Sequence, residues 1–442
     1  SEKIIDGQGY ILSPGFIDSH SHHLGDVLQN PDAISTASQG ITTIIIGQDG
    51  ESYPIPTLEQ KLKKTTVAVN VGTYTGQTSL RSQVMGDKNL LRKANQTEVD
   101  AMKALLKKDL KLGSFGLSTG LEYESAFYSS RDEVLQLAQV AANQNARYIS
   151  HIRSEDITMD DALNEIIEIG QKTLMPVQIS HIKLAKKDDW GTAQAIISRL
   201  EEARKKGINI TADIYPYTFW HSTPRILFPN RDYDNLVSAQ FAVDQLFDPS
   251  ESYLVKFAPN LSYEGKTFHD IASIRHESDA ETLRSLVSLA ADFRLKYPNY
   301  EGTIEAMTGK SMLDQDVIDF MQWEHSNICS DGNAGAHPRG FGSFTRVLGR
   351  YVREQKIMPW ETAIYKMTGL TAKHLGIKDR GIIAPGKKAD LVLINPNTVI
   401  DRAVIGDSRA ISVGIEGVWV NGSLVYSQSK STGKRSGQLI KR

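Results

Sequence analysis

Cysteine is almost absent from this sequence, since Cys329 is the only one among 442 residues. An intrachain disulfide is therefore impossible, and a zinc cluster built from several cysteines is excluded. No apolar run approaches the roughly 20 residues of a membrane-spanning helix. A strong excess of either charge is also missing, because the formal net charge is −2. We therefore expect neither a membrane span nor a global electrostatic attraction to nucleic acid.

The composition is ordinary for a globular protein, with 40% hydrophobic and 23% charged residues. The length suffices for one large domain with a smaller one, or for one domain with insertions. The chain starts without Met or a signal-peptide pattern, and its first residues are typical of the middle of a strand-rich module. We expect the numbering to begin inside a longer gene product. This leaves the compartment open between cytoplasm and periplasm.

Apolar, strand-like runs alternate with amphipathic helical patterns over most of the chain, which indicates a parallel α/β architecture. We predict eight strands, at residues 15–20, 41–47, 66–72, 115–119, 147–151, 177–181, 208–215 and 327–330. Eight strand–helix units predict a TIM-type (β/α)8 barrel, whose chemistry lies at the carboxyl ends of the strands. The aromatic and charged segment 220–325 interrupts the pattern, and we interpret it as an insertion or lid.

Further strand-like segments lie near both ends of the chain, at residues 2–12, 386–394 and 418–422. They predict a small β-sandwich module formed by both ends. The expected domains are residues 1–13 and 381–442 for this module and 14–380 for the barrel. The basic tail from residue 430 to 442 lacks interleaved aromatic residues. We interpret it as a solvated or surface-docked end rather than a nucleic-acid patch.

Histidines gather at the predicted strand ends. His20 and His22 end the first strand at alternate positions, which share one side of a strand. His151 and His181 close the fifth and sixth strands, and Asp331 ends the last one. A single histidine at a strand end is usually an ordinary polar residue, but on a closed barrel these five would surround one mouth. Four imidazoles and a carboxylate there predict a site for zinc or a similar cation.

This pattern resembles the amidohydrolase superfamily, with His-x-His on the first strand, one His each on the fifth and sixth, and Asp on the eighth. The run 381–391 is also typical of that superfamily. More narrowly, the chain resembles the N-acyl-D-amino-acid deacylase (D-aminoacylase) family over essentially its whole length. The matching stretches are 40–43, 117–121, 180–183, 211–218, 263–267 and 337–344. Hydantoinases and dihydroorotases usually carry a carboxylated Lys on strand four, and residues 113–119 contain none.

The sequence departs from the deacylase pattern at one expected ligand. The family's Gly-Asn-Cys-Gly turn, with a metal-binding Cys, is Gly-Gln-Asp-Gly at residues 47–50. Our hypothesis is that Asp49 is a metal ligand, since a carboxylate can replace a thiolate and can bridge two ions. An ordinary Asp in a glycine-rich turn is the alternative. Glu122, just past the fourth strand, could supply the anionic ligand instead.

The resemblance implies a zinc-dependent hydrolase that cleaves the amide bond of N-acyl-D-amino acids, with one or two zinc ions and a small-molecule substrate. Zinc would activate a water as hydroxide for attack on the carbonyl. Asp331 would take the nucleophile's proton and pass it to the departing amine. The ligands implied for the tighter ion are His151, His181 and Asp49. The ligands implied for the second, weaker or empty half are His20, His22 and Asp331.

A free α-carboxylate on the substrate requires a counter-charge. Arg339 matches the family's His-Pro-Arg, and a guanidinium can bind a carboxylate through two hydrogen bonds. Lys183 shares the strand side of His181, and Tyr215 or Tyr217 could add a hydroxyl. The alternatives to these binding roles are that Arg339 forms a surface ion pair and that Lys183 is a solvated charge at the rim. The apolar residues after strand seven suit an apolar acyl or side-chain group of the substrate, although core or lid packing is the commoner use of such a run. They are Phe219, Trp220, Ile226, Leu227 and Phe228.

Two other functions stay open at this point. One is an amidohydrolase that acts on a cyclic amide or an unusual dipeptide. The other is a catalytically silent relative that only binds ligand, against which the intact histidine set and Asp331 argue. The histidines without a strand-end position are read as ordinary polar residues: His221, His269, His276, His325 and His374.

Overall fold

Eight parallel strands form the centre of the protein, as the computed structural model of residues 6–7 and 9–442 shows. Each of the eight predicted strands is present, mostly in a shorter form. The strands are β2 (Phe16–Asp18), β3 (Ile41–Ile46), β4 (Asn70–Thr73), continued by β5 (Thr75–Gly76), β6 (Gly116–Gly120), β7 (Arg147–His151), β8 (Val177–Ile179), β9 (Ile210–Ile214) and β14 (Ser326–Ile328).

The strands pair in two parallel sheets, with the orders β2-β3-β4 and β14-β9-β8-β7-β6-β5. On one side the chain continues from β4 into β5, and the Phe115 amide donates a hydrogen bond of 2.9 Å to the carbonyl of Thr73. On the other side Ser21 and Gly332 form an isolated parallel bridge. The two sheets therefore meet on both sides, and their strands follow one another in chain order, as the (β/α)8 expectation requires.

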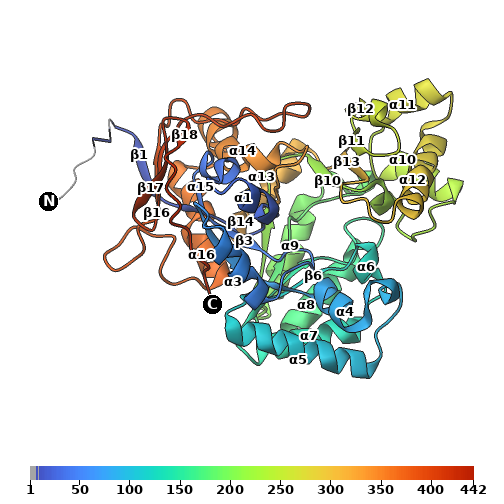
Figure 1. Cartoon of the computed structure of the whole chain (residues 1–442), viewed down its shortest axis with the longest axis horizontal. Helices are drawn as coiled ribbons and strands as arrows, with labels where there is room; N and C mark the ends of the chain where they lie inside the picture. The colour runs from blue at the N-terminus through green and yellow to red at the C-terminus, as the bar shows by residue number, and fades with distance from the viewer. Residues whose placement is uncertain (1–5, 8) are drawn as a thin grey trace.

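Amphipathic helices cover the outside of these strands (Figure 1). Helix α7 shows why they form: its buried residues Val134, Leu137, Ala138 and Ala141 recur at helical spacing, and Ser130 caps its first turn. The principal outer helices are α3 (Ile55–Lys64), α4 (Gln77–Met85), α5 (Gln96–Leu112), α7 (Arg131–Ala142), α8 (Met159–Thr173), α9 (Ala193–Lys205), α13 (Asp314–Gln322), α14 (Arg339–Arg346), α15 (Trp360–Met367) and α16 (Gly369–Leu375).

Residues 219–310, here called the insertion unit, form a separate lobe beside the strand ends (Figure 1). Its antiparallel sheet has the order β10-β13-β11-β12, and it has a hydrophobic core of its own. Its main elements are β10 (Phe219–Ser222), α10 (Leu236–Gln245), β11 (Tyr253–Phe257), β12 (Lys266–Thr267), α11 (Phe268–Arg275), α12 (Asp279–Lys296) and β13 (Glu305–Lys310). The segment expected as an insertion, 220–325, therefore comprises most of this unit together with α13, which packs against α9 of the barrel.

The two chain ends meet in one antiparallel sheet, as expected for a module built from both ends. Its order is β1-β15-β16-β17-β18. Instead of a second sheet, α2 (Ile34–Ala37) and β3 contact this sheet, so the barrel itself supplies the opposing layer. Of the expected first segment, residues 2–5 and 8 lie outside the described part of the chain. The strands are β1 (Ile11–Pro14), β15 (Leu391–Ile394), β16 (Ile415–Val420), β17 (Ser423–Ser427) and β18 (Lys430–Ser431).

The basic tail docks on the barrel. The Val71 amide donates to the carbonyl of Gln438 at 2.9 Å, and the Ile440 amide donates to the carbonyl of Val71 at 2.7 Å. The tail thus extends the edge beside β4, consistent with a surface-docked end. None of the helices in residues 6–7 and 9–442 is long and apolar enough to cross a membrane.

Candidate metal centre

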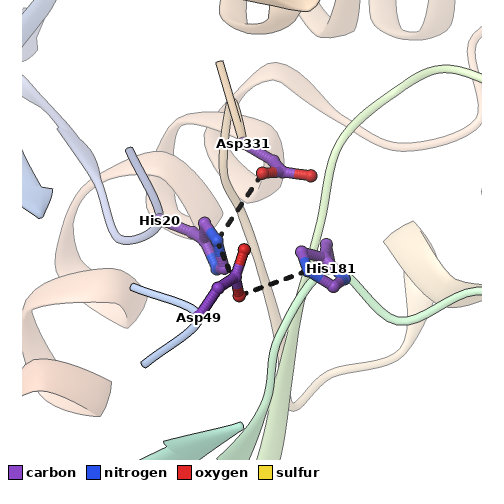
Figure 2. Close-up of side chains that lie close together, drawn as sticks. All are labelled: His20, Asp49, His181 and Asp331. Atoms are coloured by element: carbon purple, nitrogen blue, oxygen red, sulfur yellow. Dashed lines mark ion pairs between the residues drawn. The ribbon is translucent and has the colours of Figure 1, made fainter. Parts of the chain in front are cut away.

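Six polar side chains from five strands converge at the carboxyl ends of the barrel strands. Four of them, His20, Asp49, His181 and Asp331, face one another in Figure 2. Parallel strands bring their carboxyl ends to one rim, so residues far apart in sequence meet there. The six follow or end five strands: His20 and His22 after β2, Asp49 after β3, His151 at the end of β7, His181 after β8, and Asp331 after β14.

The ligand atoms fall into two halves that share Asp49. His22 Nε2 lies 3.3 Å from both Asp49 Oδ2 and Asp331 Oδ1. His20 Nε2 lies 3.4 Å from Asp49 Oδ1 and 3.6 Å from Asp331 Oδ1. In the other half, His181 Nε2 lies 3.6 Å from Asp49 Oδ1 and 3.1 Å from His151 Nδ1. Ligands at about 2.0–2.1 Å from a tetrahedral zinc are roughly 3.3 Å apart, so both halves match that spacing.

Unpartnered polar atoms show that this cluster suits a cation. Both ring nitrogens of His20 and Oδ1 of Asp49 are buried without a hydrogen-bond partner. Burying such atoms costs free energy unless a further group binds them. Imidazole nitrogens and carboxylate oxygens are the donors that zinc accepts in proteins. The residues present therefore fit a zinc-type ion.

The pKa values of the residues in this cluster also indicate a site that favours a cation. Loss of water around His22 would lower its pKa, but hydrogen bonds to Asp331 and Asp49 outweigh this effect and raise the pKa to about 10. Burial would raise the pKa of Asp49 and of Asp331, but nearby positive groups hold both pKa values well below the ordinary range. Both carboxyl groups are therefore ionised, and the site favours positive charge between them.

Three of the converging residues have left-handed backbones, with φ of 54° at Asp49, 34° at His181 and 47° at Asp331. Such conformations cost free energy in residues other than glycine, and they occur where function requires a side chain to point in one direction. At His181, a neighbouring strand holds the conformation, because the His181 amide donates a 2.6 Å hydrogen bond to Asp213 Oδ1. The backbone of Asp49 packs directly against Gly120. A Cβ atom at position 120 would lie 2.3 Å from the Asp49 carbonyl oxygen, so this packing requires glycine there.

The outward nitrogens of two histidines contact carboxylates. His151 Nε2 lies 2.8 Å from Glu122 Oε2, and His181 Nδ1 lies 3.2 Å from Glu155 Oε1. Such outer partners orient metal-binding imidazoles. Glu122 thus contacts the nitrogen of His151 that points away from the converging group, whereas Asp49 lies between the two halves. This placement favours Asp49 over Glu122 as the anionic ligand.

The four residues expected to bind the substrate carboxylate do not all lie together, because Tyr217 contacts a different part of the protein from the other three. Lys183 Nζ donates to both oxygens of Glu155 at 2.8 Å, and Arg339 forms an ion pair of 2.6 Å with Asp331. The Arg339 guanidinium also lies over the ring of Tyr215. The Tyr215 hydroxyl is buried without a partner, and burial raises its pKa to about 12. Tyr217 instead donates to Asp401 at 3.5 Å.

A pocket opens beside the His151 half of the centre. It includes Tyr215, Lys183 and Arg339, whereas Tyr217 is not among its lining residues. The insertion unit supplies the opposite wall. The lining residues are Glu122, Tyr123, His151, Glu155, Asp156, His181, Lys183, Ala185, Tyr215, Trp220, His221, Ser222, Ile226, Leu227, Leu246, Asp331 and Arg339.

Sequence reasoning missed Glu155 and Asp213, and it set His221 aside although His221 lines the pocket. A signal existed for Asp213, because it alternates with Tyr215 on one strand and therefore shares its side. Glu155 follows the end of β7 by four residues, in a loop whose direction no periodicity gives. His221 lies on β10 of the insertion unit, whose position depends on the fold of that unit.

Comparison with known proteins identifies the family that this chain matches. The model of the amidohydrolase family matches residues 3–240 and 328–426. An N-acyl-D-aspartate deacylase from Alcaligenes xylosoxydans xylosoxydans is 32% identical over 466 residues, covering 99% of this chain and 86% of that protein.

Two solved structures are similar over nearly the whole chain. The crystal structure of a D-aminoacylase has a TM-score of 0.84 at 29% identity, covering 98% of this chain and 90% of that one. An N-acyl-D-glutamate deacylase from Bordetella bronchiseptica has a TM-score of 0.84 at 30% identity, covering 99% and 90%. That structure contains zinc and a phosphonate inhibitor that mimics the tetrahedral intermediate of the reaction.

Proposed function

The chain belongs to the amidohydrolase family, and from this premise we propose that it is a zinc-dependent hydrolase of N-acyl-D-amino acids. The products are a carboxylate and a free D-amino acid. The observation that carries the proposal is the convergence of four histidines with Asp49 and Asp331 beside a pocket that contains Lys183 and Arg339. The deacylases among its relatives, one of them holding zinc with an intermediate mimic, support the same reaction.

The ligands of the proposed metal centre fall into two sets. When bound, zinc polarises the amide carbonyl and lowers the pKa of a water molecule. Asp49 belongs to the first set through Oδ1, which lies 3.6 Å from His181 Nε2, and its Oδ2 lies 3.3 Å from His22 Nε2 of the second set. The first set is His151, His181 and Asp49. The second set is His20, His22 and Asp331.

Asp331 is the proposed proton carrier. Its Oδ1 faces His20 and His22, and its Oδ2 faces Arg339. As an ionised carboxylate it can accept the nucleophile's proton and deliver it to the amide nitrogen, which is a poor leaving group until protonated. A substrate α-carboxylate that shares the Arg339 guanidinium with Asp331 would offset part of the positive charge that lowers the pKa of Asp331, and the Asp331 carboxylate would become a stronger base.

Arg339, Lys183 and Tyr215 are the proposed contacts of the α-carboxylate. All three line the pocket, and the Tyr215 hydroxyl has a free donor there. A guanidinium has five N–H donors, so Arg339 can bind a substrate carboxylate while it retains contact with Asp331. Tyr217, bound to Asp401 instead, is not part of this proposed set.

The test is hydrolysis of N-acetyl-D- and N-acetyl-L-amino acids by the zinc-reconstituted protein, with bound metal measured in parallel. We expect release of free D-amino acid that stops on chelation and returns with zinc. Asp331→Asn should reduce kcat by about 100-fold or more. Bound zinc with turnover only of a hydantoin or a dipeptide would replace this proposal with the cyclic-amide or dipeptide function. Bound zinc without turnover of any amide would indicate a ligand-binding relative.

A further inference from the structure

The pocket beside the metal centre has one apolar wall, which the insertion unit supplies. Trp220, Leu227 and Leu246 line it and are at most 7% exposed. All three also belong to the core of that unit, so their positions are fixed by packing. Ile226, half-buried between them and the surface, completes the wall. The apolar run after strand seven thus serves both as core and as pocket lining.

The cations that line this pocket are already paired. Lys183 contacts both oxygens of Glu155, and Arg339 contacts Asp331. Glu122 and Asp156 add further carboxyl groups to the lining. His221 faces the same space, but burial and the charge of Arg339 lower its pKa to about 4, so it is neutral near pH 7. Among the lining residues that the structure describes, no cation remains for a second substrate carboxylate.

Two more arginines of the insertion unit, Arg225 and Arg231, line a neighbouring cavity that shares Ile226 and Glu122 with this pocket, but they are not among the lining residues of the pocket itself. Arg225 pairs with Glu124 at 2.7 Å. Arg231 donates to the carbonyl of Phe228 at 2.6 Å and to the carbonyl of Glu122. Both guanidinium groups therefore already have partners within the protein.

The chemistry of the substrate places its side chain in this pocket. In an N-acyl-amino acid, the α-carboxylate and the side chain are attached to the same carbon, on the amine side of the scissile bond. The acyl group lies on the other side of that bond. If Arg339 and Lys183 bind the carboxylate, the side chain on the same carbon lies within reach of the pocket that they share with the apolar wall.

We propose that the wall of Trp220, Ile226, Leu227 and Leu246 binds the amino-acid side chain and selects uncharged, apolar side chains over aspartate and glutamate. The inference rests on the proposed function and specifies its substrate. An acidic side chain would place an unpaired carboxylate against apolar carbon and beside Glu122. Sites that leave a charged or polar group unpaired discriminate by large factors. We therefore expect kcat/KM to be about 100-fold or more in favour of apolar side chains.

The experiment compares kcat/KM of the zinc-loaded protein for the N-acetyl derivatives of D-leucine, D-phenylalanine, D-aspartate and D-glutamate. Ile226→Lys introduces a cation at a half-buried position of the wall, and it should raise the ratio of acidic to apolar turnover at least 10-fold. Ile226→Met controls for the loss of the branched side chain. Val237→Lys adds the same charge on the 78% exposed side of α10, away from the pocket, and should leave the ratio unchanged.

Each result has one meaning. Preference of the unaltered protein for aspartate or glutamate overturns the side-chain inference and leaves the proposed deacylation intact. Equal turnover of acidic and apolar substrates also overturns it. Failure to hydrolyse any of the four, with zinc bound, overturns the proposed function and the inference with it. Apolar preference that Ile226→Lys reverses or weakens, and Val237→Lys does not, supports both.

Discussion

Replacing Asp49 by asparagine tests the hypothesis that a carboxylate stands in the place of the deacylases' cysteine ligand. Asp49 approaches three imidazoles, with distances of 3.4 Å to His20, 3.3 Å to His22 and 3.6 Å to His181. Asparagine has nearly the same shape but carries no charge. It also tolerates the left-handed backbone that Asp49 adopts, at φ of 54°, so the turn should keep its fold.

The size of the effect follows from these distances. Opposite unit charges separated by about 3–4 Å attract each other by about 4–5 kcal/mol at an effective dielectric constant of 20, which is the upper limit for removing the Asp49 charge. Relaxation and the remaining amide oxygen recover part of this. Loss of an outer partner of a metal ligand typically costs about 10–100-fold in affinity. We therefore expect Asp49→Asn to weaken zinc binding by about 100-fold to 1,000-fold, and Asp49→Cys to restore much of it.

The assay is competition for zinc against a chromophoric chelator at fixed pH, with circular dichroism to confirm folding. Glu122→Gln is the matched control, because Glu122 contacts His151 at 2.8 Å but lies outside the converging group. We expect a loss of about 10–100-fold or less there. Unchanged affinity in Asp49→Asn, together with a larger loss in Glu122→Gln, would show that Glu122 is the ligand and Asp49 an ordinary turn residue.

Three further changes test other parts of the structure. Arg339→Gln should raise KM about 10–100-fold for free N-acyl-amino acids but not for their α-amides, because only the former carry the carboxylate; equal effects on both substrates would contradict that role. Asp213→Asn should lower zinc affinity about 10-fold or more, because Asp213 holds the backbone of His181; unchanged affinity in a folded variant would refute it. Burial lowers the pKa of Lys366 to about 8, so the unfolded state binds more protons between pH 8 and 10.5. Stability should therefore rise by up to about 3 kcal/mol as pH rises through that window, and denaturant titrations of Lys366→Met should lack this rise.

The fold and the residues at the carboxyl ends of the strands could be predicted because both depend on patterns within short stretches of the sequence. Buried parallel strands are short apolar runs, and their alternation fixes which side chains share a side. That was sufficient to place His20 beside His22 and to bring Asp331 to the same rim. The end of the insertion was harder to predict. Helix α13 has no sequence feature that assigns it to the barrel rather than to the preceding unit, and only its packing against α9 does so.

Residues in the loops beyond the strand ends could not be placed in this way, because their direction depends on partners far away in the sequence. Lys183 was expected to face the substrate, and it does line the pocket, but its ammonium group is held by Glu155. Arg339 is held by Asp331 in the same manner. These pairings matter for specificity, since the charge of each of these two cations is already partly balanced by a protein carboxylate. A second acidic group on the substrate would find no free cation among the described lining residues. The charge balance of the pocket, and not the identity of its charged residues, therefore determines which side chain can enter.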